Sequence, residues 1–414
     1  MQLRSGRSGR GRANLFRLTG TLPGSTVRGM HILDITSPVS LGPGNTVAPG
    51  TYYCEDLLAA QLLVMAGGGT MRPLEITKTP LFDRSATSDD LEMLYDDGGA
   101  GGKADCTSLL FGRTGGLGDL TLLTPVLREI KRRWPSVKIA VASIRDLQQS
   151  IQNLPFIDEL LAYPVSKEVA DTYDGWCWLE GAVEAGEDSK TLHSVDCVAK
   201  FIGLTLPDDM DKNQAYVVTP KERADIHEAY PRLPGVRRLC IQPKASAVCR
   251  TYTKTGQVIA KFLEKGWEVF LLGREGEFKT EPKPGLRCIT DGWTFRHRAA
   301  LVETCDCLLA PDSSLLHVAG ALGVPAVGLY GPFPWQLRTA YSPTTVTLTR
   351  KEGFSCAPCH FHATPMKQFP DNCPTASKGF CGVLDAITPD SIVAKVEEVA
   401  RKQDDGKVVA FESK

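Results

Sequence analysis

The strongest constraint on the fold is an apolar run, residues 308–311, that ends in Asp312 and Ser313 and restarts as a helix-forming segment containing His317. A second apolar run of strand length, Val324 to Gly331, follows that helix. Strand, helix and strand in this order are typical of a parallel α/β sheet. The turn aims a helix N-terminus, with free N–H groups and partial positive charge, at the end of the strand, where it can bind an anion such as phosphate.

A second strand–turn–helix lies earlier in the chain. Residues 109–112 have the pattern of a short strand, residues 113–119 form a glycine-rich turn, and an amphipathic helix follows. The glycines allow close approach of backbone or ligand, and Asp119 begins the helix with its carboxylate facing the strand ends. The turn has neither Gly-x-Gly-x-x-Gly nor a following Lys-Ser or Lys-Thr, so neither a dinucleotide fingerprint nor a P-loop is predicted.

Taken together, the two turns resemble glycosyltransferase family 9, the heptosyltransferase-like enzymes. Residues 113–119 resemble the opening motif of that family, and residues 312–317 with 321–332 resemble its nucleotide-sugar motif. They occur in the family's order, about 200 residues apart, as the two halves of such an enzyme would place them. The resemblance covers residues 105–402. It implies an α/β GT-B fold, with two Rossmann-like parallel-sheet halves facing a cleft.

The resemblance also implies a reaction. A sugar, heptose or hexose, would pass from a nucleotide-diphosphate sugar to a hydroxyl acceptor with inversion. Asp119 would be the catalytic base that takes the proton of the acceptor hydroxyl. The alternative for Asp119 is a helix cap. The glycine-rich acceptor loop would contribute Arg113, Gly115, Gly116 and Gly118.

Six residues are the candidates for binding the donor, with the diphosphate held at Ser313, Ser314 and the amides that follow. The chain departs from the family at Lys244, where a glycine is usual, and at Arg250, which stands in the region of the family lysine. It also departs at Ser314, where the family more often has glycine. The alternative for His317 is a core histidine. The candidates are Lys244, Arg250, Asp312, Ser313, Ser314 and His317.

No Asp-x-Asp stands in the central sheet region to hold a divalent ion against a diphosphate. The helix N-terminus, Arg250 and Lys244 could instead stabilise the charge that develops on the leaving diphosphate. We therefore expect transfer without a catalytic divalent metal.

Cysteine spacing predicts a separate metal site. Cys356, Cys359, Cys373 and Cys381 lie in a stretch rich in proline, glycine and polar residues. Four thiolates suit a tetrahedral, structural zinc or iron site. Disulfide pairing is one alternative, and replacement of one ligand by His360 or His362 is another. The spacing also resembles the iron finger of bacterial autotransporter heptosyltransferases, which helps to build a large oligomer, so a homo-oligomer is expected here.

Composition sets the outer limits. The chain has 414 residues, 42% of them hydrophobic and 23% charged, with a net charge of −1, which is typical of a soluble protein with core for two or three domains. No apolar run reaches membrane-spanning length and no signal peptide is evident, so the cytoplasm is the expected compartment.

The domain organisation follows from these patterns. We predict a basic disordered arm (1–30), a small β-rich module (31–88), an acidic and glycine-rich linker (89–104), an N-terminal Rossmann-like half on the acceptor side (105–230), a C-terminal, nucleotide-sugar half (231–350), the four-cysteine metal finger (351–385), a helix that crosses back to the first half (386–402) and a tail (403–414).

The sequence does not identify the acceptor. Lipopolysaccharide is the commonest family acceptor, and a glycan, a lipid-linked glycan, a protein side chain or a modified DNA base are alternatives, the last hinted at only by the basic arm. A non-catalytic binding or assembly protein with the same fold is the competing class. Retention of Asp119, Asp312 and His317 favours the enzyme.

Overall fold

The structure is a computed structural model of the whole chain. It describes residues 107–404, with gaps at 164, 166, 171, 180, 185–186, 274–282, 291 and 362–367, and eight short strands within the first 73 residues. The side chains of these eight strands and of residues 167, 168, 178, 187, 403 and 404 lie outside the description. The first 78 residues belong to a compact unit separate from the one that holds the two large sheets.

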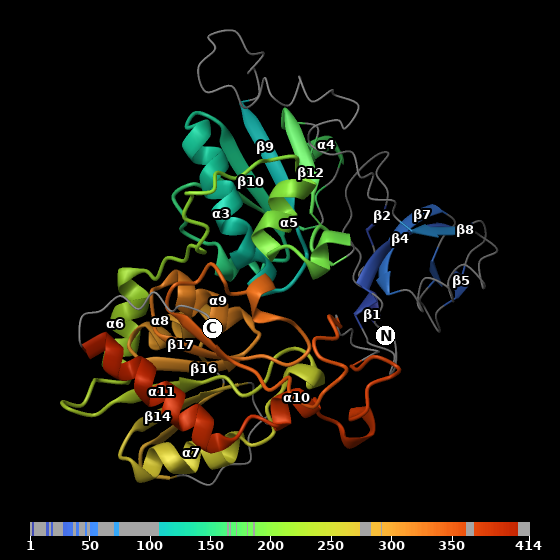
Figure 1. Cartoon of the computed structure of the whole chain (residues 1–414). Helices are drawn as coiled ribbons and strands as arrows, with labels where there is room; N and C mark the ends of the chain where they lie inside the picture. Colours follow the sequence, from blue (N-terminus) through green and yellow to red (C-terminus); the bar gives the residue numbers. More distant parts are fainter. Residues whose placement is uncertain are drawn as a thin grey trace. The chain divides into compact units, whose positions relative to one another are not determined.

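The first parallel sheet has four strands in the order β11-β10-β9-β12, of which β10, β9 and β12 are labelled in Figure 1. All three strand pairs are parallel, with Leu110 of β9 opposite Ala140 of β10 and Trp176 of β12. Its elements are β9 (Ser108–Gly112), α3 (Leu117–Arg133), β10 (Lys138–Ser143), η1 (Gln148–Ser150), β11 (Glu159–Ala162), α4 (Lys167–Ala170), β12 (Gly175–Trp178), η2 (Glu187–Lys190) and α5 (Ser194–Phe201).

The second parallel sheet has six strands in the order β15-β14-β13-β16-β17-β18. The first part of this half comprises α6 (Pro220–Ala229), β13 (Arg238–Ile241), η3 (Val248–Arg250), α7 (Thr255–Glu264), β14 (Glu268–Leu272), β15 (Leu286–Ile289), α8 (Phe295–Glu303) and β16 (Cys307–Pro311). The rest comprises α9 (Ser314–Ala321), β17 (Ala326–Leu329), η4 (Trp335–Leu337), β18 (Thr345–Leu348), η5 (Ala376–Lys378), α10 (Gly382–Asp385) and α11 (Pro389–Asp404).

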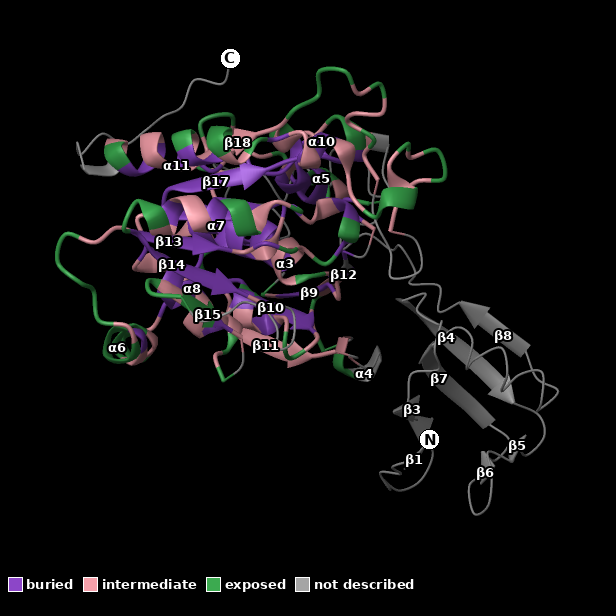
Figure 2. Ribbon diagram, turned by 90° about the horizontal axis from the view of Figure 1, so that it is seen from below, coloured by how far each residue is buried: buried purple, intermediate pink, exposed green. Residues whose placement is uncertain are grey.

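The apolar patterns explain both sheets. In the first half Leu120, Leu123 and Leu127 recur on one face of α3 and are fully buried against the strands. In the second half alternate residues of β16 enter opposite cores: Leu308 joins one face of the sheet and Leu309 the other. The central strands β13, β14, β16 and β17 are buried along their whole length and are therefore apolar runs, whereas the edge strands β11 and β18 are only half-buried (Figure 2). The predicted α/β class with two parallel-sheet halves is confirmed.

The last helix differs from its prediction. Apolar residues of α11, among them Ile392 and Val396, join the core formed with α7 and with strands β13 and β14 of the second half. The sequence predicted a return to the first half, but the apolar face of α11 matches the uncovered face of the second sheet.

The N-terminal unit contains strands only, as far as the description reaches. Strands β2 (Asn14–Leu15), β7 (Gly50–Asp56), β4 (Arg28–Ile35) and β8 (Thr70–Pro73) form one sheet in that order, while β1 (Gln2–Leu3) pairs with β3 (Leu18–Thr19) and β5 (Val39–Ser40) with β6 (Thr46–Val47). Three of these strands lie within the range for which the sequence predicted a disordered arm. The predicted acidic linker lies outside the described residues.

Candidate functional site

Sheet topology places the candidate site. Counted from β13, the second sheet runs 3-2-1-4-5-6, so the strand order reverses between β13 and β16. In such sheets ligands bind beyond the carboxyl ends of the strands at that reversal. Gln242 follows β13 there, and Asp312 and Ser313 follow β16. The hydroxyl of Ser313 donates a hydrogen bond of 2.8 Å to Oε1 of Gln242 across the reversal point.

The glycine-rich turn occupies the corresponding position in the first sheet, directly after β9. Oδ2 of Asp119 accepts a 2.7 Å hydrogen bond from the amide of Gly116, which caps the start of α3. A Cβ atom at Gly115 would lie 2.8 Å from Oδ2 of Asp119, closer than real Cβ atoms approach. Glycine is therefore required at 115 to let the carboxylate fold back over the turn.

Arg113 holds the other carboxylate oxygen of Asp119. Its guanidinium is buried, with Nη2 3.5 Å from Oδ1 of Asp119. The same guanidinium donates 2.6 Å hydrogen bonds to the carbonyl of Leu179 and to Oε1 of Glu184. Arg113 thus acts as a buried support for Asp119 rather than as an exposed contact in the loop.

The charge state of Asp119 follows from these neighbours. Burial alone would raise the pKa of Asp119, but the Arg113 guanidinium, the Gly116 amide, Arg338 and His317 together hold the pKa below its ordinary value of 3.8. About a third of the Asp119 side chain, 35%, is exposed. The carboxylate is therefore ionised at neutral pH and accessible to an incoming proton donor.

The two halves meet at Gly118. A Cβ atom there would lie 3.2 Å from Cδ2 of His317 and 3.5 Å from Cα of Ser314. The first turn of α3 therefore lies directly against the first turn of α9, and Asp119 is the next residue along. The structure in this way brings the predicted base close to the predicted phosphate-binding helix.

The residues at the start of α9 are largely buried. Asp312 is 5% exposed and His317 is 3% exposed, and Nε2 of His317 lies 3.9 Å from Oδ1 of Asp312. Burial is the main cause that lowers the pKa of His317, so the ring is neutral at pH 7. Its Nδ1 has no hydrogen-bond partner in the described part of the chain. The side chain of Ser313 makes no capping hydrogen bond at the start of α9, so the first N–H groups of this helix are left for another acceptor.

Arg250 reaches the same place, whereas the ammonium group of Lys244 does not. Nη1 of Arg250 lies 3.0 Å from the carbonyl oxygen of Asp312 and 3.4 Å from its Oδ2, and Nη2 donates to the hydroxyl of Ser246. Lys244 is exposed on the loop after β13, and its carbonyl, rather than its side chain, accepts a bond from Gln242.

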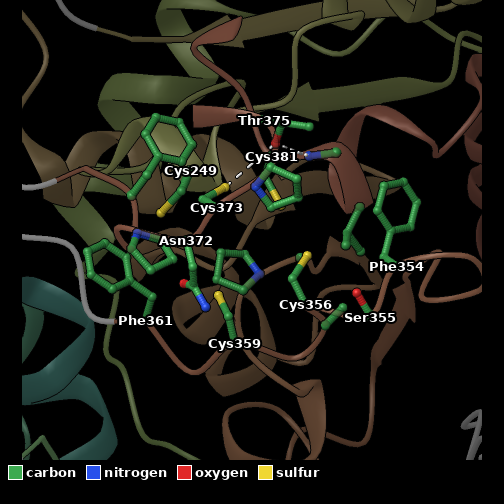
Figure 3. A pocket seen from close by; sticks show the side chains of 18 residues that line it. Cys249, Phe354, Ser355, Cys356, Cys359, Phe361, Asn372, Cys373, Thr375 and Cys381 are labelled. Atoms are coloured by element: carbon green, nitrogen blue, oxygen red, sulfur yellow. Dashed lines mark hydrogen bonds between the residues drawn. The ribbon is translucent and has the colours of Figure 1, made fainter. Parts of the chain in front are cut away.

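The four predicted metal ligands gather around one cavity of about 300 Å³ (Figure 3). All four are free thiols, so the disulfide alternative is not formed. Within the described residues, however, no three His, Cys, Asp or Glu side chains converge as metal ligands do. The donor set suits zinc or iron, but the four-cysteine metal finger is not confirmed. The alternative ligand His362 lies outside the described residues.

Sequence reasoning missed a fifth thiol on this cavity. Cys249, buried at 3% exposure, lines it together with the four predicted cysteines. Burial raises the pKa of Cys249 to about 12. Cys249 directly precedes Arg250, so the wall of the cavity continues into the loop of this predicted donor-binding residue. Cys249 is the middle residue of η3 and lies about a hundred residues before the other four cysteines, so no metal-ligand spacing in the sequence points to it. Only the structure brings it to the cavity.

The two parallel-sheet halves have the arrangement of a GT-B fold. The ionised carboxylate of Asp119 and the uncapped start of α9 lie at the strand ends where such folds bind ligands. Residues 199–369 match the family model of glycosyltransferase family 9 (heptosyltransferase). That match extends from α5 through β18 and includes Cys356 and Cys359, while Cys373, Cys381 and α11 lie beyond it. This match bears out the resemblance to family 9 and supports a glycosyltransferase. The first turn, residues 113–119, lies outside the matched range, and there the likeness to solved structures is one of fold.

Solved structures share this fold. ADP-heptose lipopolysaccharide heptosyltransferase II of E. coli superposes with a TM-score of 0.56 at 15% identity, over 72% of this chain and 99% of that chain. A family 9 glycosyltransferase of Veillonella parvula gives 0.52 at 17% identity, over 72% and 98%. The dodecameric, iron-containing TibC of enterotoxigenic E. coli, in a structure with ADP-D-β-D-heptose, gives 0.54 at 16% identity, over 73% and 79%. No curated protein matches the chain significantly.

Across the described residues, no helix is both long and apolar enough to span a bilayer.

Proposed function

We propose that this enzyme transfers a sugar from a nucleoside-diphosphate donor to a hydroxyl acceptor with inversion. The observation that carries the proposal is the contact between α3 and α9 at Gly118, because it sets the ionised Asp119 beside the helix start that follows β16. A base and an anion site this close together suit a displacement at a sugar carbon that is bonded to phosphate.

In the proposed step the acceptor oxygen attacks the anomeric carbon, and the acceptor proton passes to a carboxylate oxygen of Asp119. The bond between the anomeric carbon and the phosphate oxygen breaks, and its electron pair leaves with the nucleoside diphosphate. The amides at Ser313 and Ser314, together with Arg250, stabilise the new charge. His317 donates a further hydrogen bond from its buried position.

The donor loop tolerates its departures from the family pattern. Arg250 lies beside Asp312, and its bonds to Asp312 and Ser246 use only part of the five N–H donors of a guanidinium, so the others can bind phosphate. Lys244 contributes positive charge from the exposed edge of the loop. The similar structure of TibC with ADP-D-β-D-heptose makes ADP-heptose the first donor to test.

Replacement of Asp119 tests the function. We expect Asp119→Ala to lower turnover about 10²- to 10⁴-fold while donor affinity is kept, because a general base acts on the acceptor. Release of nucleoside diphosphate from ADP-heptose and from hexose donors, with lipopolysaccharide, protein and modified-DNA acceptors, is the measurement. A wild-type protein that binds donors and turns over none of them would support the non-catalytic alternative.

We further propose that catalysis needs no divalent metal and that the cysteine finger holds a structural zinc or iron ion. Cys356, Cys359, Cys373 and Cys381 would hold that ion, which would order the loop between β18 and α10 and take no part in the reaction. Activity should survive a chelator, and loss that Mg²⁺ or Mn²⁺ restores would contradict the proposal. Light scattering tests the expected homo-oligomer, and cell fractionation tests the expected cytoplasmic location.

A further inference from the structure

Arg338 stands apart from the other buried arginines. Four arginines are buried in the described part of the chain, and three of them pair with a carboxylate: Arg113 with Glu184 at 2.6 Å, Arg238 with Glu268 at 2.9 Å and Arg296 with Glu222 at 2.5 Å. Arg338 is 7% exposed, and no described carboxylate oxygen lies within 4.0 Å of its guanidinium. Buried charges in proteins are normally paired, so this cation lacks its counter-charge.

The contacts of Arg338 position its charge without neutralising it. Nη1 donates to the hydroxyl of Ser194 at the start of α5, and that hydroxyl donates in turn to the carbonyl of Leu337 at 3.1 Å. The guanidinium carbon lies 4.6 Å from the centre of the Phe333 ring. A hydroxyl and an aromatic face hold a guanidinium in place but carry no negative charge.

The position of Arg338 points to what supplies the missing charge. It follows η4 in the second half, yet its partner Ser194 belongs to the first half, so the guanidinium lies where the halves meet. Burial raises the pKa of Asp119, and the charge of Arg338 is one of the causes that lower it. Burial is the main cause that lowers the pKa of His317, and the charge of Arg338 lowers it further. The cation is therefore within electrostatic reach of the proposed base and of the proposed phosphate-binding helix.

We propose that Arg338 binds the diphosphate of the sugar donor, as a second arginine in addition to Arg250. The inference rests on the proposed function. Arg250 is already engaged with the carbonyl and carboxylate of Asp312, whereas Arg338 has no anion of its own among the described residues. A diphosphate carries two adjacent anionic groups, and a guanidinium matches phosphate oxygens with paired N–H donors. When the sugar–oxygen bond breaks, the leaving phosphate gains charge, and Arg338 stabilises that charge.

Nucleotide affinity of the purified full-length chain tests the inference. The probes are ADP, GDP and UDP, measured by calorimetry, and the nucleoside monophosphate of whichever diphosphate binds best. A charge-assisted bond to a buried anion predicts that Arg338→Ala weakens diphosphate binding about ten- to a hundredfold. Monophosphate binding should change much less, because a monophosphate lacks the sugar-bonded phosphate whose charge Arg338 would stabilise. Arg338→Lys should recover part of the loss, since a point charge remains.

Two control variants separate binding from support. Ser194→Ala removes a hydrogen bond that positions Arg338 and leaves its charge, so diphosphate affinity should fall much less than in Arg338→Ala. Arg223 on α6 forms an ion pair with Glu303 on α8, away from the start of α9. Arg223→Ala should therefore have no effect on diphosphate affinity. Circular dichroism checks that each variant is folded, and Arg338→Lys serves if the alanine variant is not.

Specific results would overturn the inference. Diphosphate affinity unchanged in Arg338→Ala and Arg338→Lys would remove Arg338 from the donor site while leaving the proposed function intact. Equal losses for mono- and diphosphate, or the same loss in Ser194→Ala, would make Arg338 a link between the halves only. A wild-type chain that binds no nucleoside diphosphate would instead overturn the proposed function, and the inference with it.

Discussion

One carboxylate at Asp119 serves both the local fold and the proposed chemistry. Its Oδ2 caps α3 through the Gly116 amide, while its Oδ1 faces Arg113. The two sequence interpretations, helix cap and base, are therefore compatible rather than exclusive. The cap fixes the direction of the carboxylate, and the lowered pKa keeps it ionised.

The lowered pKa of Asp119 predicts the acid side of the activity profile. A base must be ionised, so activity should persist as the pH falls and decline only below the ordinary carboxyl value of 3.8, provided the fold survives. The dependence of kcat/KM on pH measures this. An acid limb near pH 6 would contradict Asp119 as the base with its present neighbours.

His193 predicts a loss of stability in acid. Burial is the main cause that lowers the pKa of His193 to about 3, against an ordinary 6.5. Between these values the unfolded chain binds a proton that the folded chain does not, so stability falls as the pH drops from about 6.5 towards 3, by at most about 5 kcal/mol.

His193→Asn is the matched variant for this test. The ring nitrogen Nδ1 accepts the amide of Val195 and caps α5, and asparagine can cap in the same way without titrating. Urea unfolding at a series of pH values should therefore show a shallower decline for the variant. Parallel curves would exclude His193 as the source.

At the scale of elements, the contact between α3 and α9 predicts a steric effect at Gly118. An alanine Cβ there would meet His317 at 3.2 Å and the backbone of Ser314 at 3.5 Å. We expect Gly118→Ala to destabilise the fold by about 1–3 kcal/mol, because overpacking forces the two helix starts apart. Turnover should fall as well, since Asp119 is the next residue.

Gly256 provides the control for that substitution. It lies in the first turn of α7, and a Cβ atom there would have no neighbour within 4 Å. Gly256→Ala should be neutral or stabilise by about 0.4–1 kcal/mol, because alanine restricts the unfolded chain. Denaturant unfolding compares the two variants. A similar effect of both would show that the contact at Gly118 is not tight.

The cysteine segment predicts metal content. Cys356→Ser with Cys359→Ser should remove bound zinc or iron from the purified protein and lower its melting temperature, because a structural metal contributes to folding. Cys288→Ser, an exposed cysteine on β15, is the control. Elemental analysis that finds no metal in the wild type would contradict the predicted finger. Loss of the metal when Cys249 is replaced would instead add this fifth thiol to the set of metal ligands.

At the scale of the whole molecule, hydrogen bonds connect the two halves. Contacts of this kind are needed if the halves are to unfold in one cooperative transition. The amide of Ala215 donates to the hydroxyl of Thr124 at 2.8 Å, and Nδ2 of Asn213 donates to the carbonyl of Gly320 at 3.0 Å. The segment that joins the halves therefore contacts both α3 and α9. A ligand bound at the start of α9 should stabilise both halves.

Donor binding should consequently raise the midpoint temperature of a single, cooperative unfolding transition. A nucleotide at a hundredfold excess over its Kd should add about 2.7 kcal/mol to the free energy of unfolding. Differential scanning calorimetry of the wild type and of Arg250→Ala makes the comparison, and the variant should gain less at equal concentration. Two separate transitions, with only one shifted, would show that the halves are not coupled.

The sequence by itself determined the class of this protein, because apolar runs broken by Asp-Ser and by glycines encode strands, helices and their turns locally. Asp119, Asp312 and His317 could be named because they lie at strand ends, where parallel sheets place their ligand sites. The tertiary structure alone decided which of these groups meet: Gly118 against His317, Ser313 on Gln242, Cys249 beside the finger cysteines. It also placed α11 on the second half and left Arg338 buried without a carboxylate among the described residues. Such facts depend on contacts between residues far apart in the chain, and no local pattern records them.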